Sequence, residues 1–232
     1  MGQALRVTAI IPALDEEAAI GATVAGLDRS LIQEIIVVDN GSHDRTAERA
    51  AAAGARVVFE RRRGYGSACL AGVRAAGPDG LLVFLDGDGS DVPGDLVRVL
   101  DPIRQGTADL VLGSRLRGRR EAGALSAHQR WGNWLVLVLV RMLYGLRLTD
   151  FGPFRAIRAG TLARLKMSHP TYGWPIEMVV KAARHGLRIV EVPVDYRRRV
   201  GRSKVAGTLH GSLLAGYHFF VTVFRYAWGP LP

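Results

Sequence analysis

The chain has 232 residues, of which 48% are hydrophobic and 22% charged, and its formal net charge is +10. That composition excludes an intrinsically disordered chain and predicts one folded domain over residues 1–232. A single cysteine, Cys69, excludes an internal disulfide framework and favours a reducing, cytoplasmic compartment. The positive charge indicates an anionic partner, but no zinc-finger or basic-aromatic signature points to nucleic acid.

Strand and helix signals alternate through the first half of the chain. Apolar, β-branched runs predict strands at residues 5–14, 34–42, 55–60, 80–86 and 108–114. Helices are predicted between them at residues 15–27, 44–54, 65–77 and 93–106. The first helix would carry acids in its first turn, and Asp44 would be the N-cap of the second. This order predicts βαβ units and a Rossmann-like α/β fold, with a mostly parallel central sheet flanked by helices.

The second half is less regular. It predicts a helix at 126–146, a strand-like segment at 151–159, a helix at 174–186, a strand at 187–199, and a basic loop before a last helix. Two apolar stretches within it, residues 134–146 and 212–228, contain arginines and are too short or too polar for convincing transmembrane helices. We expect them either to pack internally or to lie at a membrane interface.

Charged side chains follow several of the predicted strands at their carboxyl ends. Asp15, Asp39 and Asp86 each come just after a strand, and so do Arg61–Arg63 and Arg115. Ligands of open α/β sheets bind beyond these ends. The sequence therefore predicts one cleft that gathers these acids and arginines.

The stretch "VFLDGDGSDVP" (residues 83–93) places three aspartates within a few positions. An EF-hand loop starting at Asp86 would need glycine and glutamate where the chain has Asp91 and Val97, so that interpretation fails. Asp86 could be the nucleophile of a phosphohydrolase, because the local spacing resembles the haloacid dehalogenase superfamily. Alternatively, Asp86 and Asp88 could together hold a hard divalent cation, either for catalysis or in a non-enzymatic membrane-binding module.

Several segments taken together resemble one known family. "IIPALDEEAAI", "IIVVDNGSHDRT", "RGYGSACLAG" and "FLDGDGSDVP" are similar to the nucleotide-binding motifs of family 2 glycosyltransferases with the GT-A fold. "LVLGSRLRG", "DFGPFRAIR" and "VPVDYRRRVGRSKVAGT" follow in the same order as that family's later motifs. The resemblance runs from about residue 5 to about residue 208 and favours the dolichyl-phosphate mannose synthase-like group.

The resemblance implies roles for individual residues. Residues expected to bind the nucleotide are Pro12, Leu14, Glu16, Asp39 and Asn40. Asp86 and Asp88 would be the D-x-D metal pair for Mg²⁺ or Mn²⁺, with Asp91 as a third ligand. Residues expected to contact donor or acceptor phosphates are Arg115, Arg130, Arg202 and Lys204. Residues 1–115 would form the nucleotide-sugar half and residues 116–232 the acceptor half with its amphipathic helices.

The chain departs from the family pattern at three positions of this site. Leu14 replaces an aromatic residue, Asn40 replaces the second acid of an aspartate pair, and Asp91 stands where some relatives carry histidine. These departures leave the nucleotide, UDP or GDP, and the third metal ligand open.

The resemblance implies inverting transfer of a hexose from a nucleotide-sugar to an acceptor. A polyprenyl phosphate is already anionic and needs only orientation, whereas an acceptor hydroxyl needs a base. Glu177, otherwise a surface helix acid, and Asp150 are the candidate bases. The charge and the two apolar stretches favour the lipid phosphate, approached from the inner face of a membrane; a soluble acceptor is the alternative.

Overall fold

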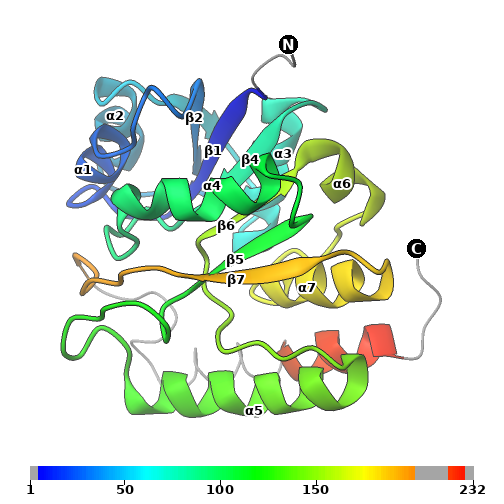
Figure 1. Cartoon of the computed structure of the whole chain (residues 1–232). Coiled ribbons are helices and arrows are strands. Elements are labelled where there is room, and N and C mark those ends of the chain that lie inside the picture. The colour runs from blue at the N-terminus through cyan, green and yellow to red at the C-terminus, as the bar shows by residue number, and fades with distance from the viewer. Residues whose placement is uncertain (1–4, 202–218, 228–232) are drawn as a thin grey trace.

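The computed structural model describes residues 5–201 and 219–227. Its centre is a seven-stranded sheet in the order β3-β2-β1-β4-β6-β5-β7 (Figure 1). The strands are β1 (Val7–Ala13), β2 (Glu34–Asp39), β3 (Arg56–Phe59), β4 (Leu81–Phe84), β5 (Leu110–Ser114), β6 (Arg155–Arg158) and β7 (Ile189–Pro193). All pairs are parallel except those of β6, which runs antiparallel between β4 and β5. The mostly parallel sheet is confirmed.

Helices cover both faces of this sheet. They are α1 (Ile20–Ala25), α2 (Thr46–Ala52), α3 (Tyr65–Ala76), α4 (Leu96–Arg104), α5 (Ala127–Tyr144), α6 (Ala159–Arg164) and α7 (Trp174–Arg184), with a short 3₁₀ helix η1 (Pro93–Asp95) before α4. One buried cluster joins a sheet face to α1, α2 and α4, and a second joins the opposite face to α3, α6 and α7. Central strands are buried on both sides, which is why they read as continuous apolar runs.

A further helical layer lies outside the sheet. α5 and the helix formed by residues 219–227 lie side by side below α7 in Figure 1. They share a small core with α7 that contains Val136, Val140, Ile176, Val180 and Val223. In residues 5–201 and 219–227, no helix is both long enough and apolar enough to cross a bilayer. One side of the stretch 134–146 packs internally through Val136 and Val140, while Trp131, Trp134 and Met142 of the same helix are exposed.

Two predicted element boundaries were wrong. α1 begins only at Ile20, so the acids at 15–17 lie in a loop and not in its first turn. Asp15 has a φ of 50°, a left-handed conformation that a helix cannot contain but a tight loop can. The last strand ends at Pro193 and not at residue 199, and the following residues turn back over the loop after β4. Both differences lie where the chain builds the site.

Candidate active site

A cleft of about 360 Å³ opens at the carboxyl ends of β1, β2 and β4. The sequence-predicted residues that line it are Pro12, Leu14, Glu16, Asn40, Asp86 and Asp88. Asp39 ends β2 and is buried just beside this edge. The expectation that the ends of these strands meet in one cleft therefore holds for the loops after the three strands.

The loops after β1 and β2 are bound to each other by side-chain hydrogen bonds. The backbone N–H of Asp15 donates to Ser42 Oγ at 3.0 Å, and that of Glu16 donates to Thr46 Oγ1 at 2.8 Å. The N–H of Glu17 donates to Asp44 Oδ2 at 3.1 Å. Asp44 also accepts the N–H of Thr46 at 2.9 Å, but the N-cap of α2 is Arg45 and not Asp44 as predicted; Asp44 lies one residue earlier, where it also binds the first loop. These bonds fix the entrance of the cleft.

Asp39 and Asn40 shape the second loop of the cleft. Asp39 Oδ1 accepts the N–H groups of Gly41 and Ser42 at 3.0 and 2.7 Å. Asn40 donates two hydrogen bonds of 2.9 Å, to the carbonyls of Glu60 and Arg62, and accepts one from the N–H of Gly64 at 2.7 Å. A carboxylate could not donate those two bonds. The asparagine that departs from the family's acid is thus the residue that joins β2 to the loop after β3.

The three acids after β4 lie close together and share unfavourable charge. Burial, and then the charge of Asp88, raise the pKa of Asp86 to about 7. Burial, and then the charge of Asp86, raise the pKa of Asp91 well above its usual range. Two or three carboxylates in one buried loop disfavour one another's ionised forms. This is an arrangement that a bound cation would relieve.

The donor atoms of these acids fit a cation only in part. Asp91 Oδ2 accepts the N–H of Asp86 at 2.9 Å, whereas Asp91 Oδ1 is buried without a hydrogen-bond partner. Asp88 Oδ1 accepts from the N–H and hydroxyl of Ser90. Within the described ranges, no three His, Cys, Asp or Glu side chains form a ready-made metal cluster. Asp86 and Asp88 can serve a hard cation that takes its remaining ligands from water and substrate oxygens, as Mg²⁺ and Mn²⁺ do.

Arg199 crosses the mouth of the same cleft. Its Nη2 lies 2.7 Å from Glu16 Oε1 and its Nη1 lies 3.5 Å from Asp88 Oδ2. The backbone holds this segment in place, since the N–H of Val200 donates to the carbonyl of Asp88 at 2.9 Å and that of Arg197 to the carbonyl of Ser90. The run Arg197–Arg199 is therefore not simply solvated: its last member joins the loops after β1 and β4.

Arg115 and Asp150 form a buried ion pair next to this cleft. The guanidinium binds the carboxylate with two bonds of 2.7 and 2.8 Å, and Asp150 also accepts the backbone N–H of Arg115. Asp150 outweighs the effect of burial and raises the pKa of the Arg115 guanidinium. The charge of Arg115 acts on Asp86 and Asp91, and its guanidinium lies 5.1 Å from the ring centre of Tyr196. Asp150 is thus committed to Arg115, which argues against its expected use as a base.

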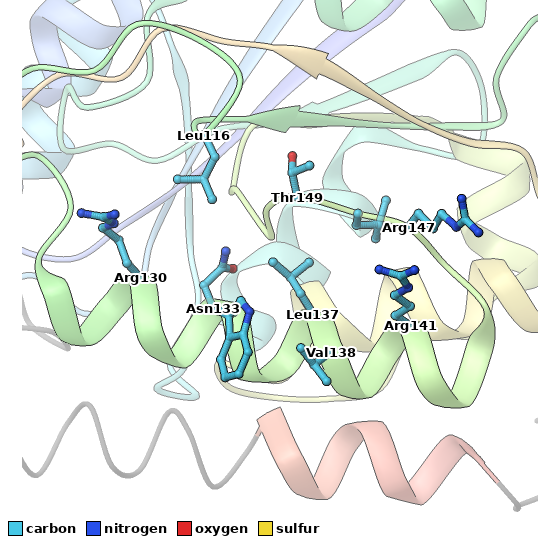
Figure 2. A pocket seen from close by; sticks show the side chains of 10 residues that line it. Leu116, Arg130, Asn133, Leu137, Val138, Arg141, Arg147 and Thr149 are labelled. Carbon is cyan, nitrogen blue, oxygen red and sulfur yellow. The ribbon is translucent and has the colours of Figure 1, made fainter.

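A second hollow, of about 420 Å³, lies between α5 and the segments that flank the Arg115–Asp150 pair. We call it the α5 groove; it is lined by Leu116, Arg130, Asn133, Trp134, Leu137, Val138, Arg141, Arg147, Leu148 and Thr149. Figure 2 shows Leu137 and Val138 on α5 beneath Leu116 and Thr149, with arginines at either end. The structure therefore places Arg130 in this groove, apart from the cleft that holds Asp86 and Asp88.

Glu177 is in neither hollow. It is fully buried on α7, where Lys181 Nζ lies 2.8 Å from Oε1. The N–H groups of Ser168 and His169 and the hydroxyl of Tyr226 also donate to it. The interpretation of Glu177 as a surface helix acid was wrong. Its carboxylate oxygens already accept these hydrogen bonds, which argues against a role as general base. The predicted phosphate contacts Arg202 and Lys204 lie outside the described residues.

Of the run Arg61–Arg63 that was expected in the cleft, Arg63 lines it. Polar or aromatic side chains that line it without having been predicted there are Tyr65, Thr171, Tyr172 and Arg199. Tyr65 follows Gly64 in a motif already recognised, so its position could have been inferred. Thr171 and Tyr172 come from the loop before α7, and no pattern in the sequence relates that loop to the first half of the chain.

Comparison with known proteins identifies the family. The model of "Glycosyl transferase family 2" matches residues 8–165. An uncharacterised glycosyltransferase of Mycobacterium tuberculosis is 38% identical, with 94% of this chain and 97% of the relative covered. An undecaprenyl-phosphate mannosyltransferase of Micrococcus luteus is 34% identical, with 89% and 90% covered.

A solved structure has the same fold. Glucosyl-3-phosphoglycerate synthase from Mycobacterium tuberculosis, in complex with Mn²⁺ and UDP-glucose, is 25% identical with a TM-score of 0.74, covering 97% of this chain and 80% of that one. The match over most of the chain, the order of the sheet and the cleft at its carboxyl edge agree with one another. The chain belongs to glycosyl transferase family 2 and is a glycosyltransferase with the GT-A fold.

Proposed function

We propose that this enzyme transfers a hexose, with inversion, from a nucleotide-sugar in the cleft to a polyprenyl phosphate in the α5 groove. The observation that carries the proposal is the composition of that groove. It combines apolar side chains with three arginines, Arg130, Arg141 and Arg147, beside the Arg115–Asp150 pair. An acceptor with a phosphate head and an apolar chain matches both parts.

For the donor, the cleft offers polar groups at the strand ends. Leu14, Pro12 and Asn40 line its inner wall and are assigned to the base and ribose, with Asp39 behind them. Asp86 and Asp88 would hold Mg²⁺ or Mn²⁺, with Asp91 beside them. The bound ion would supply positive charge against the departing nucleoside diphosphate. The Mn²⁺ and UDP-glucose in the similar synthase support this assignment.

The acceptor assignment follows from where the acids are. A hydroxyl acceptor would need a general base within hydrogen-bond reach. The two candidates, Glu177 and Asp150, are both buried and held in ion pairs at 2.8 and 2.7 Å. A phosphate acceptor is already ionised and needs only to be oriented. The arginines of the α5 groove can do that, and the mannosyltransferase relative is named for such an acceptor.

The exposed face of α5 suggests how such an acceptor is reached. Trp131, Trp134 and Met142 are exposed on this helix, and arginines flank them at positions 130 and 141. Aromatic and basic side chains on one helix favour the interface of an anionic bilayer. We therefore propose peripheral association with a membrane surface on the cytoplasmic side.

The test is a transfer assay with radiolabelled UDP- and GDP-hexoses, Mn²⁺, and undecaprenyl phosphate in mixed micelles. We expect labelled lipid with at least one donor, and its loss on adding a chelator. Parallel reactions contain 3-phosphoglycerate in place of the lipid. Transfer to that soluble acceptor and none to the lipid would overturn the acceptor assignment, and activity unaffected by chelation would overturn the metal assignment.

A further inference from the structure

Glu177 holds a loop in place from inside the protein. Its oxygens accept the N–H of Ser168 at 3.1 and 3.2 Å, the N–H of His169 at 2.8 Å and the hydroxyl of Ser168 at 3.1 Å. Burial raises the pKa of Glu177, but Lys181, the His169 amide and Tyr226 together outweigh it, and the pKa is lowered. The carboxylate therefore stays charged, and a charged acceptor holds two amides of one loop strongly.

That loop forms a wall of the donor cleft. Beyond the two amides, Thr171 and Tyr172 line the cleft. The carbonyl of Pro170 accepts the N–H of Ser67 at 2.8 Å. A Cβ on Gly66 would come within 2.0 Å of the carbonyl oxygen of His169, so the loop 168–172 lies directly against the first turn of α3. A shift in the loop would move both of these cleft walls together.

The helix of residues 219–227 supports the same loop from the other side. Tyr226 Oη donates to Glu177 Oε1 at 2.8 Å, and its ring lies 4.9 Å from Lys181 Nζ. Thr222 is buried, and a Cβ on Gly173 would lie 2.4 Å from both Thr222 Oγ1 and His169 Nε2. The helix thus binds Glu177 through Tyr226 and lies close to Gly173, directly after the loop, through Thr222, while Val223 belongs to the core shared with α5.

We propose that Glu177 and Tyr226 are positioning residues for donor binding: they make the wall 168–172 of the donor cleft depend on the docking of helix 219–227. The proposal rests on the assignment of the cleft to the nucleotide-sugar. Because the helix also packs beside α5, the same contacts connect the acceptor side of the molecule with the donor side. Glu177 then acts through the loop and not on the substrate.

The test compares two tyrosine hydroxyls that hold the same helix. Tyr226→Phe removes the bond to Glu177 and keeps the ring. Tyr144→Phe is the matched control, because Tyr144 Oη donates to the carbonyl of Val223 at 2.6 Å and makes no contact with Glu177. The tyrosine pair carries the test, because Glu177→Gln would also leave buried Lys181 without its counter-charge.

Two measurements are made on each full-length variant. Calorimetric titration with UDP and with GDP, in the presence of Mn²⁺, gives the donor-nucleotide affinity. We expect Tyr226→Phe to weaken it roughly three- to tenfold, which is less than the full effect of one lost hydrogen bond to a charged group because Tyr226 acts through the loop, and to raise the donor KM more than it lowers kcat. Tyr144→Phe should leave both within twofold of wild type, which is about the experimental scatter. Equal effects in the two variants, or none, would overturn the proposal.

Hydrogen exchange tests, without any ligand, whether the helix 219–227 holds the loop 168–172 in place. Deuterium uptake in peptides that cover the loop 168–172 and the turn 64–68 should rise in Tyr226→Phe and not in Tyr144→Phe. If wild type binds neither nucleotide, the donor assignment fails, and exchange alone decides whether the helix positions the loop. Unchanged exchange at both segments in Tyr226→Phe would overturn the inference even if nucleotide binding is normal.

Discussion

The donor cleft and the α5 groove are built in different ways. The cleft is made from loops at strand ends, which polar side chains hold in place. Asn40 and Asp44 bind backbone groups of neighbouring loops, and Asp39 binds those of its own loop. The groove is lined by side chains of one helix face and two short segments. A rigid diphosphate and its base call for fixed donors, whereas a flexible apolar chain needs only a matching surface. The first region should therefore be sensitive to single polar changes, and the second to changes in apolar area.

The largest effect is expected in the cleft. Asp88→Ala removes one of the two proposed metal ligands, and hexose transfer should fall by roughly 100-fold or more, as expected when a charge-stabilising group is lost. Asp79→Ala is the control, because Asp79 is an exposed acid just before the other end of β4. Chelator-sensitive transfer is measured for both, with circular dichroism to establish folding. Equal activity in the two variants would remove the metal site from the cleft.

The next largest effect is expected at the buried ion pair Arg115–Asp150, which lies next to both the cleft and the α5 groove. Arg115→Gln leaves the buried carboxylate of Asp150 without its partner, and the free energy of unfolding should drop by about 3 kcal/mol. The double variant Arg115→Gln with Asp150→Asn should regain part of it, because no buried charge remains. Urea unfolding measures both, with the exposed pair Arg119–Asp195 as a control in Arg119→Gln. A loss of unfolding free energy no larger than that of the control would show that the buried pair does not stabilise the fold.

A smaller and more selective effect is expected in the groove. Leu137→Asn makes one lining position polar and should raise the KM for polyprenyl phosphate roughly tenfold, from lost apolar contact with the chain. Val97→Asn is the control, because Val97 is exposed on α4 and lines neither the groove nor the cleft. Nucleotide affinity should not change in either variant. A change in nucleotide affinity alone would contradict the division into donor and acceptor regions.

The smallest effect is expected outside both regions, where β5 begins. Arg188 binds both oxygens of Asp109 and its hydrogen bonds lower the pKa of Asp109 to about 2. The ionised form is therefore favoured by folding, and its contribution is complete above the ordinary pKa of 3.8 and is lost as the pH falls toward about 2. Asp109→Asn should cost at most about 1 kcal/mol near neutral pH. Unfolding curves of the two proteins should converge as the solution is acidified, with transfer activity unaffected throughout; a gap that widens in acid would contradict this.

The donor cleft was largely predictable because most of its residues directly follow strands that can be recognised from short stretches of sequence. Apolar runs indicate the strands, and parallel strands bring their carboxyl ends to one edge, so Asp86, Asp88 and Asn40 can be placed together from the sequence alone. Other features depend on contacts between distant segments. Glu177 and Lys181 are four residues apart on α7, a spacing that usually marks an exposed helix face; only Tyr226 and the loop at 168–169 reveal that the pair is buried. The position of Arg199 in the cleft likewise could not be predicted without knowing that the last strand ends at Pro193.

The placement of β6 has a consequence for how the chain acquires its structure during synthesis. β3, β2, β1 and β4 form a continuous parallel block from residues before 85, whereas β5 pairs only with β6 and β7, which are made later. The segment 110–114 therefore has no partner strand until β6 (Arg155–Arg158) has been made, and it gains its second partner only when the ribosome has added residues up to 193. We expect the early block to collapse first and the later strands to add through β6. The cleft would then gain Asp86 and Asp88 early, and the lining residues Thr171, Tyr172 and Arg199 last.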